Sequence, residues 1–372
     1  MDPVLKHMID CVQSAHGAGA RICIRGGGTK EFYGEPAQGT VLDTRGLHGI
    51  SSHEPSELVV SVRTGTLLAD LETALAEHGQ YLPFEPPRFA SGGTVGGMVA
   101  AGLSGPARAS VGSVRDYVLG ATLLNGQGEV LSFGGQVIKN VAGYDVSRLL
   151  AGSLGTLGLL LEVSLKVLPL PPATTTLRFA MNAAGALQQL NAWAGQPLPL
   201  NASAWHQGRL TVRLSGAVAA VQTAARQMAA AQGGEVVDPK VAQAFWSGLR
   251  DHTDPFFDTR GEALPLWRLS VPATTAPITL PDNPGSADST LMEWGGAQRW
   301  LRTAASAEVV RQCAAQVGGH ATLFRAGAGA RAAVFAPLSA PLARIHQALK
   351  LSFDPHGLFN PGRMYPSSVI PA

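Results

Sequence analysis

Ser91-Gly92-Gly93-Thr94-Val95-Gly96-Gly97-Met98 opens the stretch of this chain that decides its fold, which runs to Pro169. Lys139-Asn140-Val141-Ala142-Gly143-Tyr144-Asp145 and Ala151-Gly152-Ser153-Leu154-Gly155-Thr156-Leu157-Gly158 continue it. Glycine is costly to order, because it loses the most conformational freedom on folding. A chain accepts many glycines where its backbone must come close to a ligand, and successive N–H groups of such loops can bind an anion. We therefore expect this stretch to contact a ligand, and a pyrophosphate suits it.

A third glycine-rich loop lies earlier in the chain, at Arg25-Gly26-Gly27-Gly28-Thr29-Lys30, directly after the predicted strand Arg21–Ile24. Three consecutive glycines allow unusual dihedral angles and an unobstructed approach to phosphate oxygens. The alternative for this loop alone is a tight surface turn. It is neither a Walker loop nor a Rossmann fingerprint, because it lacks the spacing of either motif.

Length and composition predict a globular protein of two domains. At 372 residues the chain exceeds one ordinary hydrophobic core, and its hydrophobic content of 45% is enough for two. The formal net charge of +2, with dispersed Lys and Arg, excludes a nucleic-acid-binding footprint. The three cysteines are too few and too scattered for a disulfide framework or an iron–sulfur cluster. With no signal peptide or membrane span visible, we expect a cytoplasmic protein.

The first half of the chain is predicted to alternate short strands and helices. Amphipathic spacing predicts a helix over roughly the first fifteen residues, and another at Thr66–His78 that Thr66 caps and Gly79 ends. Apolar runs bounded by turn residues predict the strands: Arg21–Ile24, Thr40–Asp43, Leu58–Val62, the hairpin Leu119–Leu124 with Glu129–Phe133, and Leu159–Leu168.

Three prolines at positions 169, 171 and 172 predict a domain boundary. The expected domains are therefore 1–172, 173–345 and a closing segment, 346–372, that returns to the first domain. Beyond the boundary we expect an α+β cap with an antiparallel sheet. Its predicted strands are Thr174–Phe179, Leu210–Leu214, Leu266–Pro272, Ser289–Trp294 and Arg331–Phe335, and its predicted helices are Ala217–Ala231, Ala304–Val317 and Pro341–Leu349.

Four motifs in this order resemble the FAD-binding (PCMH-type) domain of the vanillyl-alcohol-oxidase superfamily. They are Arg25–Lys30, Ser91–Gly105, Lys139–Gly158 and Phe353–Gly362. Any one motif is weak evidence, whereas four in the right order and spacing are strong. The cap segments Leu266–Pro272 and Glu293–Leu301 are similar to those of a bacterial glycolate oxidase subunit. The resemblance implies a two-subdomain FAD-binding fold followed by an α+β cap domain.

The resemblance also implies which residues contact FAD. They are Arg25, Gly26, Gly27, Gly28, Thr29, Gly92, Gly93, Thr94, Val95, Gly96, Gly97, Gly102, Gly105, Gly152, Ser153, Gly155, Gly158, Glu162, Val163 and Asn360. The first loop would donate to the pyrophosphate, Glu162 and Val163 would meet the adenine, and Asn360 would lie near the flavin. The alternative for an individual glycine is turn geometry without ligand contact. Lys30, Glu31 and Phe32 follow the first loop where covalent members often carry a histidine, so non-covalent FAD is expected.

Catalytic members of the family oxidise 2-hydroxy acids with a cap motif, His-x-Gly-Asp-Gly-Asn-x-His, and a later Glu-His pair. This chain has neither. The resemblance therefore implies a related FAD-binding catalytic subunit that carries this histidine-rich motif of the metal-bearing members, called the metal motif below. It also implies an iron–sulfur subunit that carries electrons onward. Whether such a complex brings the chain to the inner membrane stays open. The true substrate, a small 2-hydroxy acid, stays open.

Several residues outside these motifs are further candidates, each with a plainer alternative. Arg268 and Arg302 suit a carboxylate clamp, although a lone arginine is more often a structural ion-pair partner. His252, between Asp251 and Asp254, has the composition of a metal site, but a solvated turn is the preferred interpretation. The remaining candidates, with packing or turn roles as their alternatives, are Trp294, Trp300, Tyr144 with Asp145, and His356.

Three functions remain open at this point. The preferred hypothesis is the FAD-binding subunit of a glycolate (2-hydroxy acid) oxidase. A second is a self-sufficient FAD-dependent 2-hydroxy acid dehydrogenase that uses the cap arginines. A third is a scaffold that keeps the fold without useful flavin binding.

Overall fold

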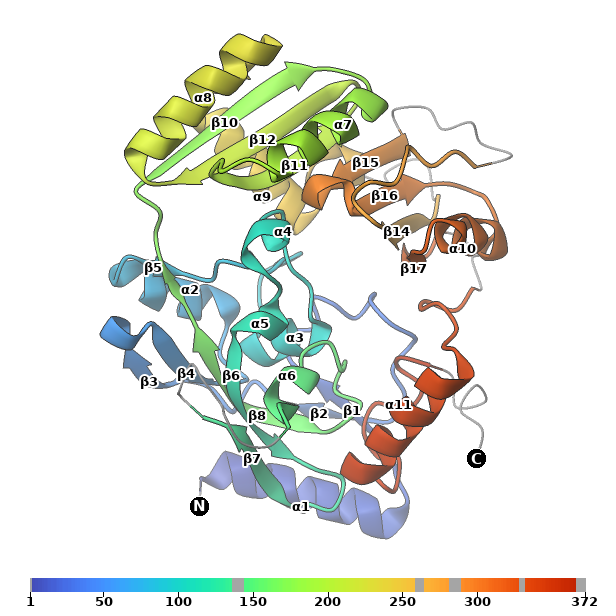
Figure 1. The fold of residues 1–372 in the computed structure, drawn as a ribbon. Coiled ribbons are helices and arrows are strands. Elements are labelled where there is room, and N and C mark those ends of the chain that lie inside the picture. The colour runs from blue at the N-terminus through green and yellow to red at the C-terminus, as the bar shows by residue number, and fades with distance from the viewer. Residues whose placement is uncertain (1, 136–143, 258–263, 281–288, 328–331, 366–372) are drawn as a thin grey trace. The chain divides into compact units, whose positions relative to one another are not determined.

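The computed structural model of the chain describes residues 2–135, 144–257, 264–280, 289–327 and 332–365 (Figure 1). Internal contacts divide it into two compact units. Unit 1 comprises Met1–Leu103, Ser113–Pro169 and Pro337–Ala372, and unit 2 comprises Ser104–Gly112 and Leu170–Ala336. The sequence predicts boundaries at 172 and 345. The contacts place the change at Leu170 and the return at Pro337, and they assign a short insert, Ser104–Gly112, to unit 2.

Unit 1 is built on a five-stranded antiparallel sheet. Its strands, in spatial order, are β3 (Ile50–Glu54), β4 (Val59–Arg63), β8 (Leu159–Lys166), β6 (Val118–Leu124) and β7 (Val130–Gly134). Helices α2 (Leu68–Glu77) and α3 (Val95–Ala101) cover its apolar side, where Leu71 and Val99 join the core with no exposed surface. The glycine-rich segments connect these elements, so the sheet holds the loops in place.

A second core in unit 1 joins the two ends of the chain. Strands β1 (Ile22–Arg25) and β2 (Thr40–Asp43) pair in parallel, and α1 (Pro3–Ala18) buries Met8 and Val12 with them. The tail after α11 (Ala340–Phe353) returns here, and Phe359 forms an isolated parallel bridge with Ile22. The smaller elements of unit 1 are β5 (Gln80–Tyr81), β9 (Leu168–Pro169), α5 (Val114–Tyr117) and α6 (Val146–Leu149).

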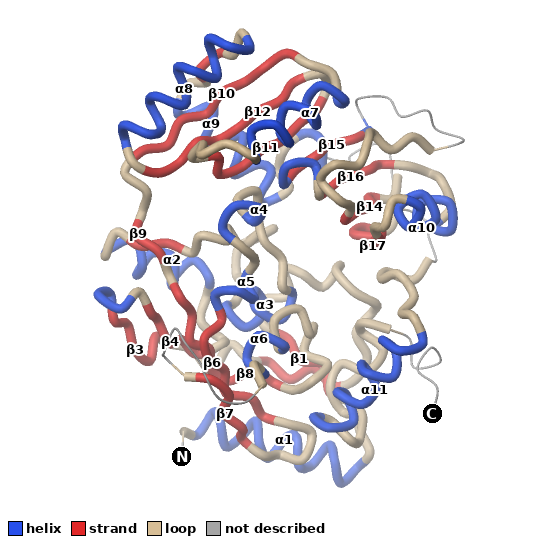
Figure 2. Tube along the Cα trace, in the orientation of Figure 1, coloured by secondary structure: helices blue, strands red, loops and turns tan. Residues whose placement is uncertain are grey.

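Unit 2 is built on an eight-stranded sheet in which every pairing is antiparallel. The spatial order is β13 (Glu235–Val236), β10 (Ala173–Ala180), β12 (Arg209–Gly216), β11 (Leu200–His206), β15 (Thr290–Glu293), β16 (Gln298–Arg302), β14 (Leu266–Ser270) and β17 (His320–Arg325). Figure 2 shows these strands as one twisted layer.

Helices cover both faces of this sheet. α7 (Ala183–Ala194) and α8 (Val218–Gln232) share one apolar core with β10, β11 and β12, and α10 (Ala307–Gln316) shares a second with β14 and β17. In β10, Leu177 points into the core with α7 and α8, so its neighbour Thr176 points to the opposite face. α9 (Pro239–Asp251) packs on that face, where its Trp246 Nε1 donates to Thr176 Oγ1 at 3.0 Å. The insert forms the short helix α4 (Arg108–Val111).

Most of the predicted elements are confirmed, and the α+β class with an antiparallel cap sheet is confirmed too. The cap assigned to Thr66 is wrong: its hydroxyl accepts from Gly49 N at 2.8 Å, and Leu67 occupies the N-cap position of α2. The strand predicted at Arg331–Phe335 is wrong for its described residues, 332–335, which lie outside any strand. The sequence patterns missed α3, α7, α9, β3, β11, β16 and β17, and also the short elements α4, α5, α6, β5, β9 and β13.

Candidate nucleotide-binding site

The described glycine-rich segments meet within unit 1, whereas Lys139–Gly143 of the predicted motif lies outside the described residues. A Cβ added to Gly27 would lie 1.6 Å from the carbonyl oxygen of Gly92, so the first two loops touch backbone to backbone. A Cβ on Gly102 would lie 2.7 Å from Cα of Gly152, and one on Gly155 would lie 2.7 Å from Nδ2 of Asn360. Glycine is required at these positions by close approach of protein segments to each other.

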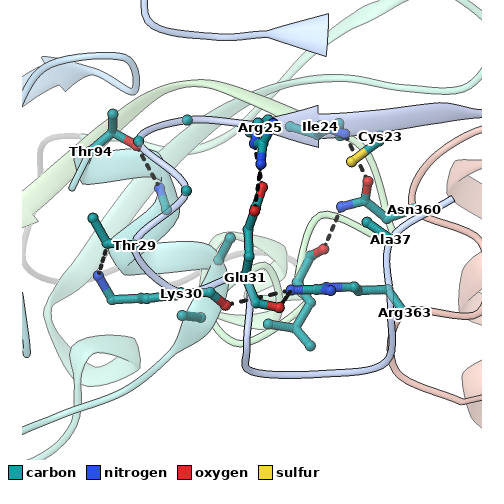
Figure 3. A pocket seen from close by; sticks show the side chains of 17 residues that line it. Cys23, Ile24, Arg25, Thr29, Lys30, Glu31, Ala37, Thr94, Asn360 and Arg363 are labelled. Carbon is teal, nitrogen blue, oxygen red and sulfur yellow. Dashed lines mark hydrogen bonds and ion pairs between the residues drawn. The ribbon is translucent and has the colours of Figure 1, made fainter. Parts of the chain in front are cut away.

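A cleft opens where these segments meet (Figure 3). Cys23 to Glu31, from β1 and the loop after it, form one wall, and α3 with its N-cap, the tail, Ala37 and Leu154 form the rest. Its volume is about 110 Å³, which suits one part of a dinucleotide rather than the whole molecule. The lining residues beyond the first loop are Ala37, Thr94, Gly97, Ala100, Ala101, Leu154, Asn360 and Arg363.

The first loop presents open backbone donors to this cleft. The N–H groups of Gly26–Thr29 donate no hydrogen bond to any other residue of the part of the chain that the structure describes. Gly28 has a φ of +70°, a left-handed conformation that glycine adopts without strain. Buried or half-buried N–H groups need an acceptor. Four successive N–H groups without a protein acceptor therefore suit a bound anion, which successive backbone N–H groups can hold in a concave site called a nest.

Three cationic side chains line the same cleft: Arg25, Lys30 and Arg363. Arg25 forms an ion pair with Glu31, and the hydrogen bond to that carboxylate raises the pKa of Arg25 further. The ammonium of Lys30 lies 5.7 Å from the centre of the Phe89 ring and 3.4 Å from Thr29 Oγ1. The surplus of positive charge beside open N–H groups suits a pyrophosphate.

Arg363 organises the loop that follows the glycines. Its guanidinium donates to the carbonyl oxygens of Glu31 and Tyr33, each at 2.9 Å, and of Glu35 at 2.5 Å. The side chain is buried, and desolvation lowers its pKa. Arg363 was not among the predicted site residues, although the tail motif runs directly into it, so its place after Asn-Pro-Gly was the available signal.

Asn360 joins three separate segments at the cleft. Its Oδ1 accepts from Ile24 N at 2.8 Å, and its Nδ2 donates to the carbonyl of Leu154 at 2.7 Å. Its own backbone N–H donates to Ile22, and its φ of +41° is one that Asn tolerates better than most residues. Asn360 therefore joins β1, the loop that contains Leu154, and the tail to one another by hydrogen bonds.

The glycine-rich segment Ser91–Met98 uses several of its N–H groups for hydrogen bonds within the protein, and these groups are not open to a ligand. The N–H groups of Val95 and Gly96 donate to Thr66 and Thr64, and that of Gly97 donates to Thr94 Oγ1 at 3.2 Å. These donors hold the start of α3. Among the predicted residues of this run, Thr94 and Gly97 line the cleft.

Other predicted contacts lie away from the cleft lining. Val163 is fully buried in β8, whose backbone pairs with strands on both sides, and Glu162 accepts from Ser51 Oγ. Gly105 lies in unit 2, where its carbonyl accepts from Trp294 Nε1 at 3.0 Å. Gly152, Ser153, Gly155 and Gly158 form the turn before β8. The contact of these residues with FAD stays a prediction.

Trp300, Trp294, Asp145 and His356 have structural roles, whereas Tyr144 is exposed. Trp300 Nε1 donates to Glu293 Oε2 at 2.6 Å inside unit 2, and Arg108 lies 4.5 Å over the Trp294 ring. Tyr144 is exposed beside Asp145, which caps α6, and the His356 ring packs 4.0 Å from that of His16.

His252 lies in a turn at the end of α9, as predicted, but its side chain is half-buried against other rings and is not solvated. Its ring stacks on Phe257 with centroids 3.8 Å apart and an interplanar angle of 4°. Desolvation first, and then the charges of Arg325 and Arg268, hold the pKa of His252 well below its ordinary value. Within the described ranges, no three His, Cys, Asp or Glu side chains gather in an arrangement that could hold a metal ion.

Comparison with known proteins agrees with this geometry. A family model described as an FAD binding domain matches residues 5–134. The chain is 46% identical to the glycolate oxidase subunit GlcE of Escherichia coli (strain K12) over 344 residues, which cover 92% of each protein. It is 32% identical over 161 residues to the glycolate oxidase subunit GlcD of Bacillus subtilis (strain 168), covering 43% of this chain and 33% of that protein. Among solved structures, an alkyldihydroxyacetonephosphate synthase shares the fold, with a TM-score of 0.65 and 16% identity over 95% of this chain and 74% of that one.

The fold and the family match define a flavoprotein of the PCMH-type FAD-binding class. Within that class, the chain belongs to the family of the glycolate oxidase subunit GlcE. Among the helices of the described residues, none combines the length and apolar character that a bilayer crossing requires.

Proposed function

We propose that this chain is the non-covalent FAD-binding subunit of a glycolate-oxidising enzyme. The observation that carries the proposal is the set of four open N–H groups at Gly26–Thr29, in a cleft that also holds Lys30 and Arg363. The residues present fit an anionic dinucleotide, because Gly26–Thr29 line a cleft together with cationic side chains and their N–H groups have no acceptor among the described residues. The family relationship to GlcE supports the identity of the dinucleotide as FAD.

FAD, when bound, supplies a ring system that accepts a hydride from an alcohol carbon. The chain's own residues bind and orient it. Gly26–Thr29 donate to the pyrophosphate, Lys30 neutralises part of its charge, and Asn360 fixes the segments that form the cleft. Lys30, Glu31 and Phe32 stand where a histidine attachment would be expected, which supports non-covalent binding.

A pair of glycine variants tests the nucleotide site. Gly28 and Gly79 both have positive φ, at +70° and +63°, and a Cβ at either meets nothing closer than 3.7 Å. Alanine should therefore cost each position about 1 kcal/mol of stability. Only Gly28→Ala alters the nest, so we expect FAD affinity to fall about tenfold or more in Gly28→Ala and to stay unchanged in Gly79→Ala.

Flavin absorbance of the purified full chain and titration of the apoprotein with FAD provide the measurement. Acid precipitation should release all the flavin into the supernatant. A colourless protein that takes up no FAD would contradict the proposal, and flavin retained in the pellet would contradict non-covalent binding.

The proposed partners are a related FAD-binding subunit with the metal motif and an iron–sulfur subunit. The likeness to GlcE and GlcD, two glycolate oxidase subunits, supports this assembly. We place the chain in the cytoplasm, with any contact to the inner membrane made through the complex. Under anaerobic conditions, we expect glycolate or D-lactate to leave the flavin of the isolated chain oxidised and to bleach it when the metal-motif subunit is present.

One feature of unit 2 favours the self-sufficient dehydrogenase as a second candidate. Arg268 and Arg325 both lie beside the Phe324 ring, at 5.6 and 5.8 Å, and the charge of Arg268 contributes to lowering the pKa of the nearby His320. Such a cationic group could hold a substrate carboxylate. Bleaching of the isolated chain by glycolate, lost in Arg268→Gln, would replace the first proposal with this one.

A further inference from the structure

A cavity of about 330 Å³ lies within unit 2, away from the arginines described above. It opens over the middle of the eight-stranded sheet, where the start of α7 and the loop at 277–279 contribute the remaining walls. Most of its lining is apolar, from Trp205, Leu269, Ile278, Met292 and Leu301. The volume is at the lower end of the range for small-molecule pockets, about 300–1,000 Å³.

One buried charge lines this cavity. Strand pairing places Trp205 opposite Met292, Met292 opposite Arg299, and Arg299 opposite Leu269, so these four side chains form one row across four strands. Paired residues of antiparallel strands point to the same face. Arg299 is therefore the single charged residue in an otherwise apolar row, and the single charged one among the described residues that line the cavity.

The charge of Arg299 has no neutralising partner in the described part of the chain. Its side chain is 2% exposed. Nε donates to the carbonyl of Gly296 at 2.5 Å and Nη2 to that of Thr275 at 2.8 Å, and no carboxylate forms an ion pair with it. Desolvation lowers its pKa to about 10, so the guanidinium stays protonated at neutral pH. A buried charge of this kind is costly without an opposite charge.

We propose that this cavity binds a monocarboxylate with an apolar body, and that Arg299 holds its carboxylate. Two carbonyl oxygens use only part of the donor capacity of a guanidinium, which carries five N–H groups. The remaining donors suit the paired oxygens of a carboxylate. The ring of Trp205 and the side chains of Ile278 and Met292 would take the apolar body. This inference is independent of the FAD proposal, because the two sites lie in different units.

The plainer alternative is that Arg299 only supports the turns at Gly296 and Thr275. Removing Arg299 alone cannot separate the two roles, because both would be lost. A second variant must therefore close the cavity and leave Arg299 in place. Ala183 and Ala184 are neighbours in α7, of which Ala183 lines the cavity and Ala184 is exposed and does not. Ala183→Leu should fill the cavity, and Ala184→Leu is its matched control.

The experiment titrates the full-length, FAD-loaded chain with octanoate and with octanamide, its neutral analogue, by calorimetry and tryptophan fluorescence. We expect saturable binding of octanoate, at least tenfold weaker binding of octanamide, and a loss of at least tenfold in octanoate affinity in Ala183→Leu and Arg299→Met. Ala184→Leu should bind as the unmodified chain does. Circular dichroism would verify that each variant is folded.

Three results would overturn the proposal. Absence of saturable octanoate binding to the unmodified chain would show that Arg299 has a structural role only. Equal affinity for octanoate and octanamide would show that the guanidinium does not recognise charge. Undiminished binding in Ala183→Leu would place the carboxylate elsewhere on the protein.

Discussion

Among the described residues, each unit buries one arginine, and the two arginines differ in how many hydrogen bonds and opposite charges surround them. Arg363 in unit 1 is 8% exposed and donates to at least three backbone carbonyls, and the charges of Glu31 and Glu35 favour its protonated form. Arg299 in unit 2 is 2% exposed and donates to two carbonyls, and desolvation alone shifts its pKa. Both side chains line a cavity.

The difference shows how a buried cation can serve two purposes. The guanidinium of Arg363 donates to backbone carbonyls of this chain. In its cleft, the backbone N–H groups of Gly26–Thr29 are the ones that have no acceptor among the described residues. Arg299 retains donor capacity in an apolar cavity, so the side chain is the recognition group. In the two proposals, unit 1 recognises an anion with backbone N–H groups and unit 2 does so with one side chain.

The largest expected effect concerns the backbone contact that shapes the cleft. Gly27→Ala would place a Cβ 1.6 Å from the carbonyl oxygen of Gly92, so one loop must move. We expect a loss of about 3–5 kcal/mol in the free energy of unfolding together with loss of FAD, measured by urea denaturation and flavin content.

Gly17→Ala is the control for that variant, because a Cβ at Gly17 meets nothing within 4 Å inside α1. It should raise stability by about 0.5–1 kcal/mol, the usual gain from replacing a helical glycine. A Gly27→Ala protein that keeps both its stability and its flavin would show that the two loops do not depend on their contact.

The next effect compares the two arginines directly. Arg363→Met leaves several buried carbonyls without a donor and should cost about 3–4 kcal/mol. Arg299→Met loses fewer hydrogen bonds and removes a buried charge that has no counter-ion, so we expect a cost of about 1 kcal/mol or less. Chemical denaturation of both variants under identical conditions is the measurement, and equal costs would break the comparison.

A smaller expected effect is a loss of stability at low pH that comes from His252, whose pKa is lowered by desolvation and by the charges of Arg325 and Arg268. The pKa of His252 is held well below 6.5, so the unfolded chain binds this proton at a higher pH than the folded one. Its contribution to stability is therefore complete above about pH 6.5 and is lost as the pH falls below that value, by up to about 2 kcal/mol at pH 5.

His252→Asn should reduce this pH dependence, since Asn tolerates the φ of +55° at this position and does not titrate. The readout is the difference in unfolding free energy between pH 7 and pH 5, which separates the titration from the loss of stacking on Phe257. An unchanged pH dependence in the variant would assign it to other groups, such as His320 or His346, whose pKa values are also lowered by burial.

Much of the architecture followed from local patterns. The helix over the first residues, the hairpin of β6 and β7 and the strands around the glycine-rich loops were predicted because periodicity and turn residues are properties of short segments. α7 and α9 were missed although each carries an apolar stripe at helical spacing, through Leu187, Leu190 and Trp193 in α7 and through Ala242, Trp246 and Leu249 in α9. The stripe of α7 packs into the apolar core that it shares with β10, β11 and β12.

What the sequence determined by itself was the presence of an FAD-binding fold, the spacing of its glycine-rich loops and the absence of the metal motif from this chain. The tertiary structure decided which of those glycines face a cleft and which only let one backbone pass close to another, as Gly27 does at Gly92. It also revealed Arg299, because a side chain becomes a buried, uncompensated charge only when distant strands pair around it. Local patterns specify dihedral angles and faces, whereas burial and charge pairing depend on residues far apart in the chain.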